Sequence, residues 1–101
     1  MPVTLAEVRA KRAAIRNLLE ASGAANPRVF GSLAREEADE KSDVDIVVDF
    51  REPAPEGFAY FGALDLLQRE LGHLLGTRVH VTVVDPTSAI GREILGEALP
   101  L

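Results

Sequence analysis

Two aspartates, Asp43 and Asp45, stand two residues apart and follow the pair Gly31-Ser32 after ten intervening residues. If they lie on a strand, side chains two residues apart share a face, and their Cα atoms are about 6.6 Å apart. Carboxylates at that separation can lean together toward a pair of metal ions roughly 3.5–4 Å apart. Because both ligands are oxygens, the metal expected there is Mg²⁺ or Mn²⁺. Asp43 and Asp45 are therefore candidate metal ligands on geometry, although an aspartate pair of this kind on a strand is more often a solvated face.

The pair Gly31-Ser32 is expected at a turn where a strand passes into a short helix. Gly31 has no Cβ, so the backbone can approach a ligand closely at this position. The start of the following helix would present free amides and the positive end of the helix dipole, which together bind anions. Ser32 adds a hydroxyl donor. These features suit the terminal phosphates of a nucleotide, although each motif taken alone is more often a plain turn or a solvated strand face.

The spacing of apolar residues predicts the elements that must position these groups. The expected order is αβαβαβα, with helix 4–21, strand 28–31, helix 32–38, strand 43–50, helix 58–75, strand 78–84 and helix 88–99. Thr4 and Glu7 match a capping box at the start of the first helix. Asn26-Pro27 is expected to break the chain before the first strand. This order indicates an α/β (α+β) fold, a mixed sheet of about three to four strands with helices packed on one side.

Alternation within residues 43–50 predicts a strand with one buried face. The side chains expected to face the core are Val44, Ile46, Val48 and Phe50. The opposite face carries Asp43, Asp45, Val47 and Asp49. In the helix 58–75 the expected apolar stripe consists of Phe61, Leu64, Leu67, Leu71, Leu74 and Leu75. Gly76 is expected to end that helix.

The composition sets broad limits. A chain of 101 residues is expected to form a single domain over residues 1–101. Its 47% hydrophobic and 27% charged residues are typical of a soluble globular protein, and its net charge of -5 disfavours strong non-specific binding to nucleic acid. The absence of cysteine excludes disulfides, thiolate metal ligands and cysteine nucleophiles. No apolar run approaches the roughly 18 residues of a membrane span, and no signal peptide is evident, so the cytoplasm is the expected location.

The segment 29–50, VFGSLAREEADEKSDVDIVVDF, resembles the signature of the DNA-polymerase-beta-like nucleotidyltransferases. Within that superfamily it is most similar to the minimal nucleotidyltransferases, many of which are antitoxins paired with HEPN-domain toxins. The order of elements and the chain length extend the resemblance over nearly the whole chain. The resemblance implies a small nucleotidyltransferase fold. In that fold Gly31 and Ser32 would bind the triphosphate, and Asp43 and Asp45 would bind the metal.

Two further residues take their significance from this resemblance. Arg35 stands where the family often carries a basic residue in the short helix, so it would contact a phosphate or else be a solvated helix charge. Active members usually carry a third carboxylate on a neighbouring strand, in a pattern like V-D-L. The matching stretch here is Val79-His80-Val81, which puts His80 where that aspartate would stand. Strand alternation agrees, since His80 lies on the face opposite Val79 and Val81.

The replacement of a carboxylate by His80 bears directly on activity. A neutral imidazole supplies no negative charge and is a poor ligand for Mg²⁺, which prefers oxygen. It could serve as a general base, because its pKa lies near neutrality, or it could bind Mn²⁺ or Zn²⁺. The other interpretation is a polar residue left at a site with impaired chemistry. Asp43, Asp45 and His80 are thus the candidate catalytic residues.

Three other titratable residues are not expected in the site. Asp49 lies four residues beyond Asp45, about 13 Å along a strand, which is too far for the same metal pair. Asp85 precedes Pro86 and is expected to belong to a turn. His73 is expected to be solvated or to face a helix end.

The resemblance implies a metal-dependent nucleotidyltransferase that moves a nucleoside monophosphate, AMP from ATP, to a hydroxyl group. The family suggests a tyrosine of a HEPN toxin as the acceptor, so the chain would act as an antitoxin with ATP and a HEPN-domain protein as partners. The alternative is a catalytically impaired binding module that neutralises its partner by contact. A third hypothesis, an α/β module with no nucleotide role, requires the spacing of the motif to be a coincidence.

Overall fold

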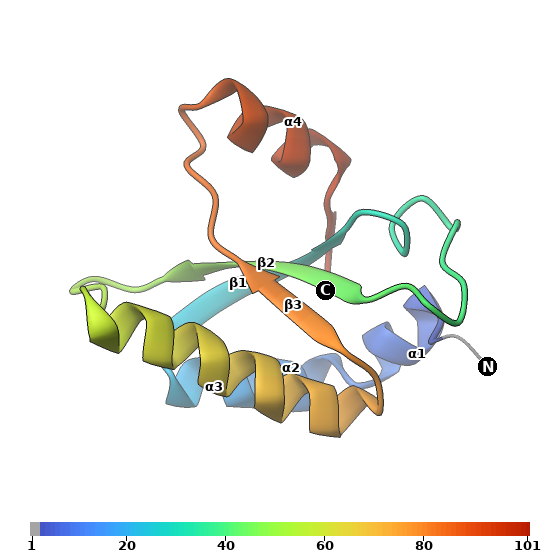
Figure 1. Ribbon diagram of the computed structural model, residues 1–101, viewed down its shortest axis with the longest axis horizontal. Helices are drawn as coiled ribbons and strands as arrows, with labels where there is room; N and C mark the ends of the chain where they lie inside the picture. Colours follow the sequence, from blue (N-terminus) through green and yellow to red (C-terminus); the bar gives the residue numbers. More distant parts are fainter. Residues whose placement is uncertain (1–2) are drawn as a thin grey trace.

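The computed structural model describes residues 3–101 as a four-stranded sheet with helices on both of its faces (Figure 1). In chain order the elements are α1 (Leu5–Ala10), α2 (Arg12–Ala21), β1 (Ala24–Phe30), β2 (Val44–Phe50), α3 (Phe58–Leu75), β3 (Val79–Thr82), α4 (Ala89–Glu97) and β4 (Leu99–Pro100). The strand order is β3-β2-β1-β4. β1 runs antiparallel to β2 and β4, whereas β2 and β3 are parallel. The predicted α+β class and the predicted mixed sheet are therefore confirmed.

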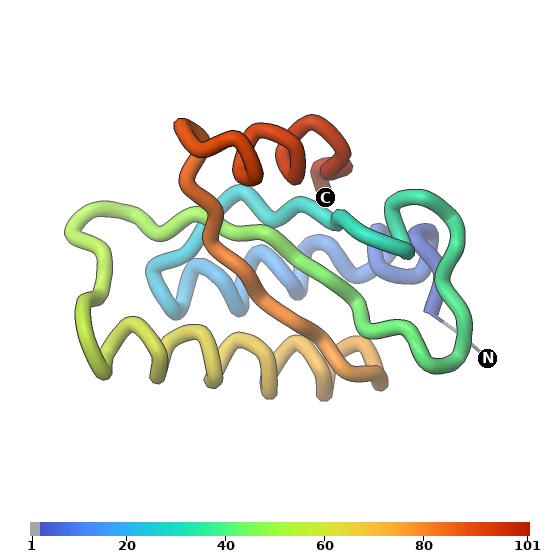
Figure 2. The backbone as a smooth tube through the Cα atoms, turned by 45° about the horizontal axis from the view of Figure 1, so that its top comes forward, coloured from blue at the N-terminus to red at the C-terminus, as the bar shows by residue number. Residues whose placement is uncertain are grey.

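The helices lie in two layers. Figures 1 and 2 show α2 and α3 side by side on one face of the sheet and α4 on the other face. The expectation that the helices pack on one side is therefore wrong for α4. The physical reason lies in β2, where Val47 points away from the main core and is nevertheless fully buried. This face of the sheet thus has apolar surface of its own to cover.

The main core lies between the sheet and the layer formed by α2 and α3. The side chains with at most 1% exposure in this core are Val8, Ile15, Leu19, Ala24, Val29, Ile46, Val48, Leu67 and Leu71. Phe61 was expected in the apolar stripe of α3 but is 68% exposed. Its neighbour Tyr60 is half-buried and packs edge-on against Phe50, with ring centroids 5.9 Å apart. The start of α3 is therefore rotated so that Tyr60 contacts the sheet.

The first predicted helix is divided in two. Thr4 caps α1 as expected, since its hydroxyl accepts a hydrogen bond from the Glu7 amide at 3.1 Å. At Lys11 the backbone turns to φ -102° and ψ 12°, and α2 begins at the next residue. The Lys11 ammonium donates to the Leu74 carbonyl of α3 at 2.9 Å. The spacing of apolar residues could not reveal this break, because the break coincides with a contact between Lys11 and a residue distant in sequence.

β1 is longer than predicted, because Asn26-Pro27 forms a bulge and does not end the strand. The pairing with β2 shifts register between Ala25 and Arg28. Asn26 adopts a left-handed conformation with φ 54°, which asparagine tolerates better than most residues. A bulge also accommodates Pro27, which has no N–H to donate to a ladder. β1 therefore starts earlier than expected, and its other end leads into Gly31 as predicted.

The segment after β1 is a single turn and not the predicted helix 32–38. The Glu37 amide donates to the Ser32 carbonyl at 2.8 Å. The Glu36 amide donates to the Leu33 carbonyl at 3.2 Å. This nested pair of bonds, with Glu36 left-handed at φ 59°, is the Schellman arrangement that ends a helix. The helix therefore ends one turn after it begins, and no glycine in the sequence marks its end.

The second half of the chain follows the prediction more closely. α3 has the predicted bounds, and Gly76 ends it in a left-handed conformation with φ 69°. β3 is shorter than predicted, and α4 ends at Glu97. The residues after α4 form β4, a short strand that pairs with β1 and that the sequence did not indicate. Within residues 3–101, no helix is long and apolar enough to cross a bilayer.

Replacement of Leu71, which is 0% exposed in α3, tests the packing of the main core. We expect Leu71→Ala to lower the free energy of unfolding by about 2–5 kcal/mol, because it removes buried carbons and leaves a cavity. Leu66→Ala on the same helix is the matched control, since Leu66 is 44% exposed, and its expected cost is under about 1 kcal/mol. Urea unfolding followed by circular dichroism measures both, and equal losses would contradict this packing.

Candidate functional site

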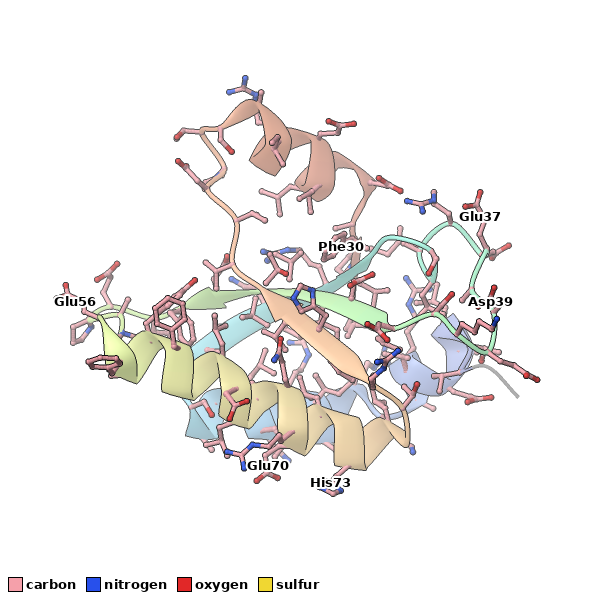
Figure 3. The ribbon with its side chains drawn as sticks, viewed as in Figure 1. Phe30, Glu37, Asp39, Glu56, Glu70 and His73 are labelled. Atoms are coloured by element: carbon pink, nitrogen blue, oxygen red, sulfur yellow. The ribbon has the colours of Figure 1, made fainter. Side chains whose placement is uncertain are left out.

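The register of the sheet brings the predicted site residues together on one face. Asp45 in β2 pairs with His80 in β3 on one side and with Phe30 in β1 on the other. Residues paired across neighbouring strands share a face, so the three side chains point the same way. Figure 3 shows Phe30 on the side of the sheet that faces α4, and His73 on the opposite side, at the outer surface of α3. The candidate site thus lies on the α4 side of the sheet.

Asp45 and His80 form a cross-strand pair. His80 Nδ1 lies 3.7 Å from Asp45 Oδ1, which is too far for a hydrogen bond but close enough for a charge interaction. Burial of the carboxyl is the main cause that raises the pKa of Asp45, the charge of His80 opposes it, and the negative charge of Asp43 adds to it. The ionised carboxylate of Asp45 is therefore incompletely compensated by the groups around it.

Gly31 touches this carboxylate. A Cβ on Gly31 would lie 2.8 Å from Asp45 Oδ2, closer than real Cβ contacts, and the φ of Gly31 is 74°. Any other residue type would have to push the Asp45 carboxylate aside and would strain the backbone as well. From the sequence, Gly31 is expected to permit close approach of a ligand. In the structure it permits close approach of Asp45, and so it joins the turn to the predicted metal ligand.

Asp43 lies just before β2 and is paired with Arg78, which lies just before β3. Arg78 Nε is 3.1 Å from Asp43 Oδ1, and the Val44 amide donates to the Arg78 carbonyl at 2.9 Å. Asp43 therefore already has a cationic partner from its own chain. Arg78 was not among the residues predicted for the site. Strand alternation could have found it, because Arg78 stands two residues before His80 and so shares its face.

The turn that follows Gly31 leaves backbone amides unpaired within the turn even though it is not a regular helix. The amides of residues 35–37 donate to carbonyls of the same turn. The three preceding amides, 32–34, have no partner within the turn, as at the start of any helix. Gly31 and Ser32 thus lead into a group of amides that an anion could bind, next to Asp45.

Arg35 extends from this turn toward α4. Its Nη1 lies 2.6 Å from Glu97 Oε1, and its Nε lies 3.0 Å from Glu37 Oε2. The hydrogen bond that Arg35 donates to Glu97 is the main cause that raises the pKa of Arg35, followed by the one that it donates to Glu37. No sequence pattern marked Glu97 as a partner, because the contact joins positions far apart in the chain. The expected contact between Arg35 and a phosphate requires release from Glu97 and stays a prediction.

The three residues that were not expected in the site have other surroundings. Arg28 Nη2 lies 3.1 Å from Asp49 Oδ1, and this hydrogen bond is the main cause that lowers the pKa of Asp49. Asp85 Oδ1 accepts a hydrogen bond from the Thr87 amide at 2.9 Å, which places Asp85 in a turn. His73 is exposed in the last turn of α3.

Asp43 and Asp45 fit a divalent cation in donor chemistry. Both supply oxygen ligands, and burial, the main cause of the raised pKa of Asp45, disfavours the negative charge that a cation would offset. Within residues 3–101, however, no group of three or more histidine, aspartate or glutamate side chains has the spacing of a metal site. Asp43 is at the same time paired with Arg78. His80 would add a nitrogen donor, which suits Mn²⁺ better than Mg²⁺.

A cavity of about 300 Å³ opens beside Asp43. Its other lining residues include Leu33, Asp39, Ser42 and Thr77. Gly31, Asp45 and His80 do not line it. The face that carries the Asp45–His80 pair therefore lies outside this cavity and meets it only at Asp43.

Comparison with known proteins gives matches over most of the chain. The model of the family described as nucleotidyltransferase domain matches residues 12–98. A solved structure described as a candidate minimal nucleotidyltransferase aligns with 97% of this chain and 96% of its own chain, at 37% sequence identity and a TM-score of 0.78. No curated protein shows a significant match.

The contact between Gly31 and Asp45 can be tested by Gly31→Ala, with Gly23→Ala as the matched control. Both glycines have φ 74°, but a Cβ on Gly23 would meet nothing within 4 Å. We expect Gly23→Ala to cost about 1–2 kcal/mol through the left-handed backbone alone. Gly31→Ala should cost at least about 1 kcal/mol more, because it also displaces the Asp45 carboxylate. Urea unfolding measures the difference, and equal costs would mean that the close approach is not tight.

Asp45→Asn is expected to raise the free energy of unfolding at pH 7. Folding raises the pKa of Asp45 above its ordinary value of 3.8, so the folded state binds the proton more tightly than the unfolded chain. Stability therefore falls as pH rises from that ordinary value through the raised value. Removing the charge recovers this loss, by at most about 1 kcal/mol because the group is only half-buried.

Asp49→Asn on the same strand should change stability in the opposite direction. Folding lowers the pKa of Asp49, so its contribution is present above the ordinary value of 3.8 and is lost as pH falls below it. Asp49→Asn is therefore expected to destabilise the protein at pH 7 and to have less effect at pH 3. Urea unfolding at both pH values gives the comparison. Effects of the same sign at pH 7 would show that the two aspartates do not differ in the way described.

Proposed function

The chain belongs to the nucleotidyltransferase domain family, and on that premise we propose that it transfers a nucleoside monophosphate, AMP from ATP, to a hydroxyl group. The observation that carries the proposal is the contact between Gly31 and Asp45, with a separation of 2.8 Å for a Cβ at Gly31. A turn suited to phosphate and a carboxylate suited to metal are in contact there. Phosphoryl transfer needs both of these groups at one place.

The turn and the two aspartates would bind different parts of the metal–nucleotide complex. The amides after Gly31 and the hydroxyl of Ser32 would hold the terminal phosphates. Asp43 and Asp45 would hold Mg²⁺ or Mn²⁺, as oxygen ligands do for these ions. When bound, the cation offsets the negative charge of the triphosphate and favours ionisation of the attacking hydroxyl. Arg35, once released from Glu97, would add a positive charge beside the phosphates.

His80 is suited to the role of general base. Its imidazole is exposed, and Asp45 beside it, at 3.7 Å, would stabilise the positive charge that the ring gains with a proton. In the proposed step the acceptor oxygen forms a bond to the α-phosphorus, and the bond from that phosphorus to the β-phosphate oxygen breaks. The acceptor proton goes to His80, and pyrophosphate leaves.

The proposed acceptor is a tyrosine of a HEPN-domain toxin, so that the chain acts as its antitoxin. The support for this acceptor is the resemblance to minimal nucleotidyltransferases in residues 29–50. The exposure of His80 is compatible with it, because a side chain presented by another protein can reach the imidazole.

Two observations favour an alternative, a binding module that neutralises its partner by contact. His80 stands at the position of the third carboxylate, and Arg78 forms an ion pair with Asp43, with 3.1 Å between Nε and Oδ1. Both reduce the negative charge available to a metal. In this alternative the sheet edge would retain its shape without performing the transfer.

The transfer is tested by incubating the chain and its partner with ATP labelled at the α-phosphate, in the presence of Mg²⁺ or Mn²⁺. We expect label on the partner, and a loss of at least about 100-fold in rate for Asp43→Asn/Asp45→Asn, because both ligands of the cation are removed. Asp65→Asn, an exposed aspartate on α3, is the control and should leave the rate unchanged.

The same variants separate the two candidate functions. If the double variant loses label transfer and also loses neutralisation of the partner, the enzymatic function is supported. If no label is transferred with either metal, while wild type and double variant neutralise the partner equally, the binding module is the correct account.

A further inference from the structure

Two acid–base pairs lie next to each other across the start of β2 and β3. Arg78 Nε is 3.1 Å from Asp43 Oδ1, and His80 Nδ1 is 3.7 Å from Asp45 Oδ1. The register supports this arrangement, since Val44 pairs with Val79 and the flanking residues follow in order. Each predicted metal ligand therefore has a basic neighbour from the adjacent strand.

Arg78 is less restrained than two other ion-paired arginines, Arg28 and Arg35. Its side chain is 83% exposed and contacts Asp43 through Nε alone. Arg28 is only 18% exposed and bonds both the Asp49 carboxylate and a backbone carbonyl. Arg35 bridges two glutamates. An exposed pair held by one contact is weak, so little opposes the movement of Arg78 away from Asp43.

The topology puts Arg78 at the same edge of the sheet as the turn suited to phosphate. β1 runs antiparallel to β2 and Phe30 pairs with Asp45, so Gly31, just after β1, lies at the same end of the sheet as Asp43, just before β2. β3 runs parallel to β2, so Arg78 lies at that edge too. With neighbouring strands about 4.8 Å apart, Arg78 and Gly31 are separated by two strand spacings, about 10 Å. A triphosphate extending from the turn and an arginine side chain together cover such a distance.

We propose that Arg78 is an exchangeable counter-ion of this site, which neutralises Asp43 in the free protein and binds the triphosphate once a divalent cation has taken Asp43. This rests on the proposed function, because it assigns Arg78 a role at the same site. The guanidinium group suits the second position, since its planar set of donors matches phosphate oxygens. In the first position it competes with the cation for the same carboxylate. Arg78 thereby lowers the affinity for free metal and raises the affinity for the metal–nucleotide complex.

The test compares Arg78→Gln with Arg69→Gln. Arg69 is also exposed and also forms one aspartate pair, with Asp65 at 3.1 Å, but it lies on α3 away from the site, so it controls for the change in net charge. Mn²⁺ alone is titrated into each protein and followed by electron paramagnetic resonance. ATP with Mg²⁺ is then titrated by calorimetry. Circular dichroism verifies that both variants are folded.

We expect Arg78→Gln to bind Mn²⁺ about fivefold more tightly than the control and to bind ATP with Mg²⁺ about fivefold more weakly. Arg78→Lys, which keeps the charge but loses the planar donors, should restore the weak binding of Mn²⁺ and only part of the nucleotide affinity. Changes of opposite sign in the two titrations support the proposal. An unchanged Mn²⁺ affinity, or changes of the same sign, would overturn it.

These outcomes are distinct from a failure of the proposed function. The Mn²⁺ titration concerns the free protein and needs no nucleotide and no transfer. Absence of label transfer by the wild type would reject the enzymatic function while the exchange of Arg78 still held. Normal transfer by Arg78→Gln with unchanged affinities would reject the exchange alone.

Discussion

The site depends on one close contact, in which the Gly31 turn at the end of β1 lies against the carboxylate of Asp45 in β2. A Cβ on Gly31 would lie 2.8 Å from Asp45 Oδ2, which is too close. The turn and the carboxylate can therefore adjoin only because this residue is glycine. The antiparallel register of β1 and β2 determines that the turn after β1 lies next to Asp45. The parallel register of β2 and β3 pairs His80 with the same residue. Groups distant in sequence thereby share one edge of the sheet.

The electrostatics of that edge follow from the same registers. Asp43 faces Arg78, just before β3, and Asp45 faces His80 in β3, yet burial still raises the pKa of Asp45. Burial thus disfavours the negative charge of Asp45, whereas Arg78 pairs with Asp43. The replacement of a third carboxylate by His80 reduces the negative charge further. Whether the edge performs nucleotidyl transfer or only retains its shape for contact with a partner depends on this balance of charge.

The spacing of apolar residues correctly predicted the strand and the helix whose buried faces follow a regular local pattern. Alternation in 43–50 predicted β2, and the apolar spacing in 58–75 predicted α3 with its bounds. The elements that were wrong depend on other information. The turn 32–37 ends early through a left-handed residue that is not glycine, and β1 continues through a bulge at a proline. The face of the sheet on which α4 packs depends on tertiary contacts and not on a local pattern. For the site, the motif placed Asp45, and alternation placed His80 and could also have placed Arg78. The contact between Glu97 and Arg35 joins elements far apart in the chain, and no local pattern contains it.

The most direct test of the site is the chemical-shift change of backbone amides when ATP with Mg²⁺ is added to ¹⁵N-labelled protein. The structure predicts that the largest changes fall at the turn after Gly31, at Asp45 and at His80, with little change in the first turn of α3 at the far end of β2. Changes centred elsewhere would contradict the assignment of this sheet edge as the nucleotide site. So would the absence of any change at ATP concentrations high enough to saturate a site with a millimolar dissociation constant.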